Sequence, residues 1–289
     1  MQFTAGDNTK ICLLTLTALA VCVSNTDAVA ADQRPLLHAS YSKLCTVAAK
    51  LKKTPKRSAK LLEVMAKAAE TSATAALKFR IKKAIHSKPA DKAIATAIIM
   101  LLEKIGAAAL HDMKSKAHKL VRAATTCTAL AARISETLTM FNNAGHGSGY
   151  CLDSTTPDRS GHVAFASQDC LNDDLAVTPS DDKWEATKLK ADGFADGPGT
   201  GNPVSQSSSS NSKCLLVDTG SAETTNCFGS RSRFIAGILT LSGASGSRIA
   251  AMNAGVGKSD RQDKKLLEAA LEDANVVNSE TIENYKKLR

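Results

Sequence analysis

In the first part of the chain, apolar side chains recur at alternate steps of three and four residues. Twelve positions between Tyr41 and Phe79 follow this repeat, and ten of them could face a partner helix. Such a narrow stripe is typical of a helix in coiled-coil packing. Pro55 lies within it and cannot donate the usual helical hydrogen bond, so we expect a kink or a restart there, with Thr54 as the cap. The twelve positions are Tyr41, Leu44, Ala48, Leu51, Pro55, Ser58, Leu62, Met65, Ala69, Ser72, Ala76 and Phe79.

A second apolar stripe follows a break at residues 87–91, where Pro89 pushes the residue before it out of helical geometry. The stripe begins at Ile94, Ile98, Leu101 and Ile105, slips in phase near Gly106, and then resumes. Its later positions are Leu110, Met113, Ala117, Leu120, Ala124, Cys127, Ala131, Ile134, Leu138 and Phe141. Two long helices joined by a short turn lie antiparallel. The pattern therefore predicts a mainly α fold with a long, coiled-coil-like helical hairpin over residues 32–143, each arm about 70 Å long at 1.5 Å per residue.

The composition changes after residue 143. Residues 144–233 are rich in Gly, Ser, Thr, Asp and Pro, which predicts a loop-rich lobe held by cysteines rather than by a large core. Residues 197–212 are low in complexity and should form mobile surface. The chain has no N-x-[ST] acceptor, so the candidates for attached sugar are hydroxyls in this segment, chiefly Ser207, Ser208, Ser209 and Ser210.

A helical pattern returns after Asp260, and we assign residues 234–289 to a returning helical segment. Its apolar face consists of Leu266, Leu267, Ala270, Leu271, Ala274 and Val277.

The first 31 residues have the pattern of a signal peptide. Lys10 precedes an apolar run over residues 11–23, which is shorter than the roughly 20 residues needed to span a bilayer. Small residues follow and offer cleavage after Ala30 or Ala31. The mature chain would then cover residues 32–289, without Cys12 and Cys22.

Six cysteines remain after that cleavage: Cys45, Cys127, Cys151, Cys170, Cys214 and Cys227. An even number in an oxidising compartment predicts three disulfides, and the residues by themselves leave all pairings open. No two of these cysteines are closer than 13 positions, and no matching histidine pair accompanies them. His111 and His118 are too far apart along a helix to hold one ion, so we expect no metal site.

Charge is concentrated in the predicted hairpin, where residues 36–143 carry 20 Lys and Arg against 6 Asp and Glu. The run of residues 78–83 is a candidate patch for nucleic acid or for a membrane surface. Because the charges alternate with the apolar stripe, and because the signal peptide predicts secretion, we favour a solvated helix face and expect no nucleic-acid partner.

Catalytic motifs are missing from the sequence. No serine lies in a G-x-S-x-G elbow, and the run of residues 255–259 lacks the first glycine of a phosphate-binding loop. We therefore expect no enzyme activity and no cofactor.

Several motifs occur together in a specific order. Tyr41-Ser-Lys-Leu-Cys45 opens the alanine-rich hairpin, Cys127 lies on its second helix, and Gly149-Tyr-Cys-Leu152 comes just past the end of that helix. In this set the chain resembles the amino-terminal domain of trypanosome variant surface glycoproteins of the A type, over essentially all of residues 32–289. The resemblance implies disulfides between Cys45 and Cys151, between Cys127 and Cys170, and between Cys214 and Cys227.

The resemblance also implies a function. Such proteins form a dense coat of homodimers, shield the membrane and vary in sequence to escape host antibodies, so the implied partners are a second copy, neighbouring coat molecules and antibodies. Contact with the membrane would be only through a GPI anchor. Residues 279–289 are polar and charged, unlike the cysteine-rich domains and hydrophobic tail with which the family usually continues. We thus expect the extracellular face of the plasma membrane, or secretion if the chain is complete as given. The alternative is a surface receptor of the same helical architecture that binds a host macromolecule.

Overall fold

The computed structural model describes residues 35–85, 88–144, 150–155, 162–168, 170, 177–184, 189–190, 193–194, 214, 233–242, 248–252, 265–282 and 285. The chain divides into two compact units. The first consists of Met1–Ala49, Leu130–Asp173 and Lys190–Leu267, and the second of Lys50–Ala129, Asp174–Leu189 and Glu268–Arg289. The predicted signal peptide, the serine-rich residues 197–212 and Cys227 lie outside the described residues.

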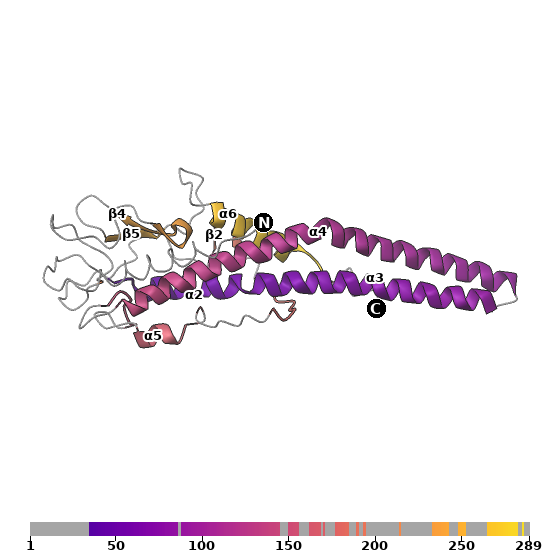
Figure 1. Cartoon of the computed structure of the whole chain (residues 1–289), viewed down its shortest axis with the longest axis horizontal. Helices are drawn as coiled ribbons and strands as arrows, with labels where there is room; N and C mark the ends of the chain where they lie inside the picture. Colours follow the sequence, from indigo (N-terminus) through magenta and orange to yellow (C-terminus); the bar gives the residue numbers. More distant parts are fainter. Residues whose placement is uncertain are drawn as a thin grey trace, which may run out of the picture. The chain divides into compact units, whose positions relative to one another are not determined.

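Helices dominate the described residues, which confirms the prediction of a mainly α fold (Figure 1). They are α2 (His38–Leu51), α3 (Lys53–Ile85), α4 (Pro89–Asn143), α5 (His162–Ala166) and α6 (Lys265–Ser279). The described strands are short: β1 (Leu189–Lys190), β2 (Gly193–Phe194), β3 (Arg233–Phe234), β4 (Leu239–Ser242) and β5 (Arg248–Met252).

The helix boundaries follow the two prolines. The predicted restart is confirmed, because α2 ends at Leu51 and α3 begins at Lys53, which places Pro55 in the first turn of α3. A missing N–H costs little there, since the first N–H groups of a helix have no partner in the helix. Thr54 is not the cap, because it already lies inside α3. α4 begins at Pro89, since proline is favoured at the first position of a helix.

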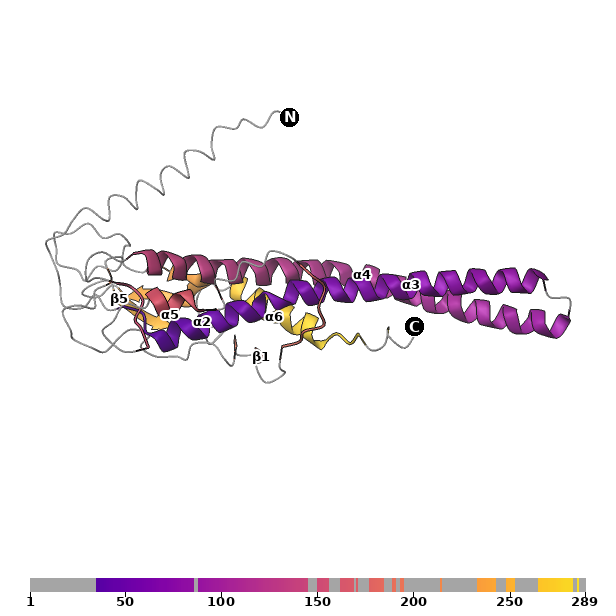
Figure 2. The ribbon, with the colours of Figure 1, turned by 90° about the horizontal axis from the view of Figure 1, so that it is seen from below.

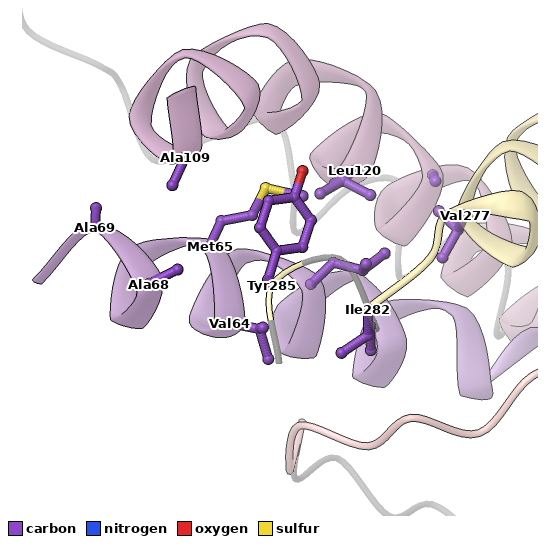
Figure 3. Packing of buried hydrophobic residues seen from close by; sticks show 11 residues of the cluster. Val64, Met65, Ala68, Ala69, Ala109, Leu120, Val277, Ile282 and Tyr285 are labelled. Carbon is purple, nitrogen blue, oxygen red and sulfur yellow. The ribbon is translucent and has the colours of Figure 1, made fainter. Parts of the chain in front are cut away.

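In the second unit, α3 and residues 89–129 of α4 run antiparallel side by side (Figure 1, Figure 2). Their alanines let the two backbones approach closely, and Gly106 lies at one such contact: a Cβ built on it would be 3.4 Å from the Ser72 Cβ. The core also receives side chains from α6 and from the residues after it (Figure 3). Its members are Leu61, Val64, Met65, Ala68, Ala69, Ala109, Leu120, Ala123, Val277, Ile282 and Tyr285.

The predicted stripe of the first arm is confirmed, and that of the second arm is wrong in its first part and at Leu110, which is 51% exposed. Nine of the twelve positions from Tyr41 to Phe79 are buried and the other three are half-buried. On α4, in contrast, the side facing α3 is shifted by one residue from the predicted one. It consists of Ala95, Ile99, Leu102, Gly106 and Ala109, which keep the 3–4 repeat without a phase slip.

In the first unit, the chain before α2 pairs with the chain after α4. The Leu36 N–H donates to the Cys151 carbonyl at 2.8 Å, and the Asp153 N–H donates to the Leu36 carbonyl at 2.9 Å. The Tyr41 hydroxyl donates to the Asp153 carbonyl at 2.9 Å, and its ring contacts Phe165 edge-on. These contacts confirm that the start of the first helix meets the exit of the second.

The assignment of residues 234–289 to a helical segment is correct only for α6. Residues 233–252 instead contain the three-stranded antiparallel sheet β3-β4-β5. A short apolar run bounded by glycines suits strands better than a helix, which needs a longer amphipathic pattern. Between β3 and β4, Ile235, Ala236 and Gly237 all have positive φ, which makes the tight connection. The predicted apolar face of α6 is confirmed, since Leu267, Ala270, Leu271, Ala274 and Val277 are buried and Leu266 is half-buried.

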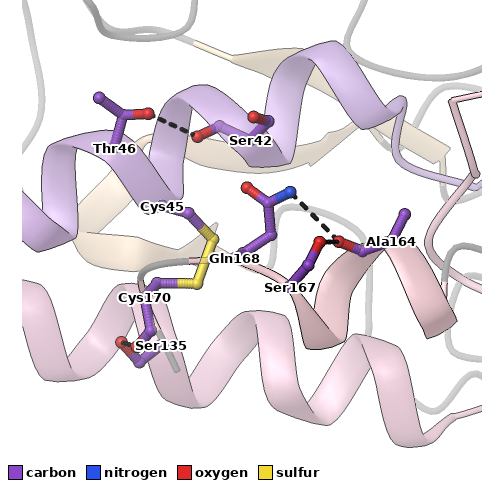
Figure 4. Close-up of a disulfide and its surroundings, with 8 residues drawn as sticks. All are labelled: Ser42, Cys45, Thr46, Ser135, Ala164, Ser167, Gln168 and Cys170. Atoms are coloured by element: carbon purple, nitrogen blue, oxygen red, sulfur yellow. Dashed lines mark hydrogen bonds between the residues drawn. A yellow bond between two sulfur atoms is a disulfide. The ribbon is translucent and has the colours of Figure 1, made fainter. Parts of the chain in front are cut away.

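The disulfide pairing implied by the resemblance is wrong. Cys45 bonds Cys170 (Figure 4), and Cys151 bonds Cys214. The predicted partner of Cys45 was Cys151. However, the backbone of Cys151 pairs with Leu36, which precedes Cys45 by nine residues. At the rise of a helix, nine residues correspond to about 13 Å. Cys170 is also held against α4, where its carbonyl accepts a hydrogen bond from Ser135 at 2.8 Å.

Cys127 is buried and has no disulfide. It precedes Ser135 by eight residues on α4, or about 12 Å, so it lies too far along the helix to reach Cys170. With Cys214 bound to Cys151, the implied Cys214–Cys227 bond is also wrong.

Candidate functional site

Among the described residues, no group of three His, Cys, Asp or Glu side chains is placed to hold a metal ion. The one free thiol in this part of the chain, Cys127, lies 3.4 Å from the Ala270 carbonyl of α6. Burial raises the pKa of this thiol from its ordinary value of 9.0 to about 12, so it stays protonated and unreactive at neutral pH.

Arg57 joins three segments of the second unit from inside α3. Its guanidinium, 1% exposed, donates to the Val277 carbonyl at 3.1 Å and to the Glu280 carbonyl at 2.6 Å. It also donates to the Asp181 carbonyl at 3.0 Å and forms an ion pair with the Asp181 carboxylate. The last carbonyls of a helix have no partner within the helix, so Arg57 satisfies the C-terminal end of α6. The apolar periodicity does not predict this role, although an arginine directly before the stripe position Ser58 is a signal for it.

Further polar contacts hold α6 and the residues after it against α4. The buried Asp273 accepts hydrogen bonds from Arg122 at 2.9 Å and from Thr126 at 2.9 Å. Lys116 donates a hydrogen bond to Glu280 at 2.6 Å. Burial disfavours the charged form of Lys116, but the hydrogen bond and the negative charge of Glu280 outweigh it and raise the pKa of Lys116. The Tyr285 hydroxyl donates to Asp112 at 2.5 Å. These contacts stabilise the packing and resemble no catalytic arrangement.

An apolar face of α4 in the second unit is left largely uncovered by the described residues. Ile94 and Leu101 are 60% and 58% exposed, and Ile98 and Ile105 are half-buried. These four residues, called here the α4 seam, lie about 90° around the helix from the residues that pack on α3. By length and composition alone, part of α4 is long and apolar enough to cross a membrane, and 22% of that stretch is buried in the structure. The features are those of an exposed interaction surface.

The comparisons with known proteins agree on one family. The sequence matches the family described as "Trypanosome variant surface glycoprotein (A-type)" over residues 17–288. Among solved structures, the chain is similar to the one titled "Structure of MITat 1.1", with 18% identity and a TM-score of 0.58. That match covers 85% of this chain and 69% of the other. None of the curated proteins compared with the sequence matches it.

The family match extends over nearly the whole chain, and the structural match independently supports the fold. Neither finding supports the receptor alternative. The family consists of structural surface proteins that form a coat, rather than of known enzymes. The chain therefore belongs to the A-type trypanosome variant surface glycoproteins, the cell-surface coat antigens that shield the membrane and evade immunity by antigenic variation.

Proposed function

We propose that this chain enters the coat as a homodimer whose two copies pack along the α4 seam, Ile94, Ile98, Leu101 and Ile105. The observation that carries the proposal is the exposure of this second apolar stripe on a helix whose first stripe is already covered by α3. An exposed apolar face of this kind usually marks a partner surface.

The spacing of the seam fits a two-stranded coil. Steps of four, three and four residues are those of alternating core positions in a heptad. Ile98 and Ile105 then occupy the first core position, and Ile94 and Leu101 occupy the second. β-branched side chains at the first position with leucine at the second, as at Ile98, Leu101 and Ile105, favour pairs of helices, whereas isoleucine at the second position, as at Ile94, favours larger bundles. A symmetric dimer also uses the same patch on both copies, so a single seam is sufficient.

The excess of basic residues opposes self-association. With 20 basic against 6 acidic residues over positions 36–143, two copies side by side repel each other. Salt screens exposed charges, with a Debye length of about 8 Å at physiological ionic strength. The dimer should therefore tighten as salt rises.

The remaining features of the proposal follow the family and the sequence pattern. The chain would be secreted after cleavage at Ala30 or Ala31, held at the outer surface through a GPI anchor, and free of catalytic activity. Sugar at Ser207, Ser208, Ser209 or Ser210 is part of the same proposal. Neighbouring coat molecules and host antibodies would be its partners, with no nucleic acid.

Light scattering and sedimentation of the purified, disulfide-bonded chain test the dimer. Ile94→Asp with Leu101→Asp should give a monomer, because both side chains are exposed in one copy and buried between two. Met100→Asp is the matched control, since Met100 is an equally exposed apolar residue on another side of the same helix. A wild-type chain that remains monomeric at high concentration and high salt refutes the proposal. So does a dimer that the seam variant does not weaken.

A further inference from the structure

A further stripe of exposed and half-buried positions lies on α4 in the second unit, away from the α4 seam. Its large apolar members, Leu110 and Val121, are 51% and 58% exposed. Leu110 follows Ile94 by 16 residues, and Val121 follows Ile105 by the same number, so each lies about 160° around α4 from the seam. The stripe keeps alternate steps of three and four residues and consists of Glu103, Ala107, Leu110, Lys114, Ala117, Val121, Ala124 and Thr128.

α3 contributes a matching stripe to the same side of the hairpin. Ala73, Leu77 and Arg80 are exposed, and their spacing of four and three residues puts them on one side of α3. Arg80 forms an ion pair with Glu103 of the α4 stripe, so the two stripes lie on one side of the hairpin. Their apolar members, called here the hairpin flank, are Leu62, Ala66, Ala73, Leu77, Ala107, Leu110, Ala117, Val121 and Ala124.

The hairpin flank faces away from α6 and carries little charge. Asp112, which accepts a hydrogen bond from Tyr285, is two positions from Leu110 and hence about 160° around α4 from it. Between positions 107 and 128, Lys114 is the one charged residue of the α4 stripe. A lysine at a single core position between helices fixes the register at a cost in stability. The basic excess that opposes self-association over the rest of the hairpin is therefore small on this side.

We propose that the hairpin flank forms a weak lateral contact between neighbouring copies of this chain in the coat. The inference rests on the proposed function, in which neighbouring coat molecules are partners, but it uses a different surface from the α4 seam. The alanines let helices of two copies approach closely, and the 3–4 repeat suits packing of helix on helix. A twofold axis along the hairpin brings the same patch of both copies together and keeps the copies parallel, as in a layer of identically oriented molecules.

The size of the hairpin flank fits a weak contact. α4 rises about 30 Å from Ala107 to Thr128, and two helices side by side are about 20 Å wide, so each copy buries at most roughly 600 Å². A total of about 1,200 Å² lies at the lower limit for stable complexes. Copies held close together meet at effective concentrations on the order of millimolar, which is sufficient for such a contact. A polyanion is a poorer match, because Lys114 alone would pair with it and the apolar side chains would stay exposed.

Sedimentation of the purified, disulfide-bonded chain at rising concentration tests the proposal. We expect association beyond the seam dimer as the concentration approaches about 1 mM. Leu110→Asp with Val121→Asp should raise the dissociation constant of this second step by about 10-fold or more, because the new carboxylates of two copies would be brought together. Both side chains are exposed in one copy, so the folded state and the seam dimer should be unchanged.

Two further variants separate the hairpin flank from other surfaces. Met100→Asp with Val163→Asp adds two carboxylates at exposed apolar residues outside the flank and should associate as the wild type does. Ile94→Asp with Leu101→Asp should lose the seam dimer and keep the weak association, so the two proposals can fail separately.

Three results would overturn the lateral contact. The first is a wild-type chain that shows no association in this concentration range other than the one that the seam variant abolishes. The second is a flank variant that associates as the wild type does, or no more weakly than the control. The third is a flank variant that loses the tight dimer, which would make the hairpin flank the dimer interface itself.

Discussion

Replacing Arg57 with methionine tests how the C-terminal end of α6 is held. Methionine keeps most of the apolar length of the side chain but donates no hydrogen bond. The change removes the donors of the Val277, Glu280 and Asp181 carbonyls in one step. We expect α6 to loosen from its C-terminal end.

The size of the effect follows from the burial of these groups. A buried carbonyl left without a donor costs about 1–3 kcal/mol, and a partly hydrated one costs roughly half of that. The Asp181 carboxylate is 42% exposed, so its ion pair adds less than about 1 kcal/mol. Arg57→Met should therefore lower the free energy of unfolding by about 3 kcal/mol, and Arg57→Lys, which keeps one or two of the bonds, by about half as much.

Denaturant unfolding followed by circular dichroism measures the loss, and hydrogen exchange locates it in the last turn of α6. Arg80→Met is the matched control, because Arg80 is an exposed arginine of α3 that also has a carboxylate partner, Glu103. That control should cost less than about 1 kcal/mol. If Arg57→Met costs no more than the control, or if exchange in α6 does not change, the reasoning is refuted.

Three further predictions concern Cys127, Gly106 and the disulfides. The Cys127 thiol should resist alkylation in the folded protein and react on unfolding. Because its pKa rises from 9.0 to about 12 on folding, its contribution to stability should be complete below about pH 9 and be lost towards pH 12, and comparison with Cys127→Ala isolates that slope. Gly106→Ala should be neutral or stabilise by up to about 1 kcal/mol, whereas Gly106→Leu should cost about 1–3 kcal/mol in thermal unfolding, through overpacking against Ser72. Peptide mapping without reduction should recover Cys45–Cys170 and Cys151–Cys214, and a Cys127–Cys170 peptide would contradict the structure.

Much of the fold follows from local rules. The stripe from Tyr41 to Phe79 was predictable because a single apolar face repeats there with the period of a helix. The helix boundaries near Pro55 and Pro89 were predictable because proline removes a donor and restricts its neighbour. The apolar face of α6 was predictable for the same reason as the first stripe.

Local rules do not determine which face of α4 is buried. Two faces of this helix satisfy the same 3–4 repeat, one formed by large side chains (Ile94, Ile98, Leu101) and one in which large and small side chains alternate (Ala95, Ile99, Gly106). A ranking by hydrophobicity favours the face of larger residues, and that face was predicted to be buried. The structure buries the mixed face because its small residues and the alanines of α3 allow the two backbones to come close, and the face of large residues remains as the α4 seam.

The sequence by itself determined the helical periods, their breaks and the family, since each depends on residues close together in the chain or on their order. Only the tertiary structure decided which face of α4 is buried, which cysteines pair, and that Arg57 meets the end of α6. Each of these depends on distances between segments as far as 223 residues apart. A periodic pattern specifies that a face exists, but the partner of that face is set by packing, because two faces of one helix can have the same period.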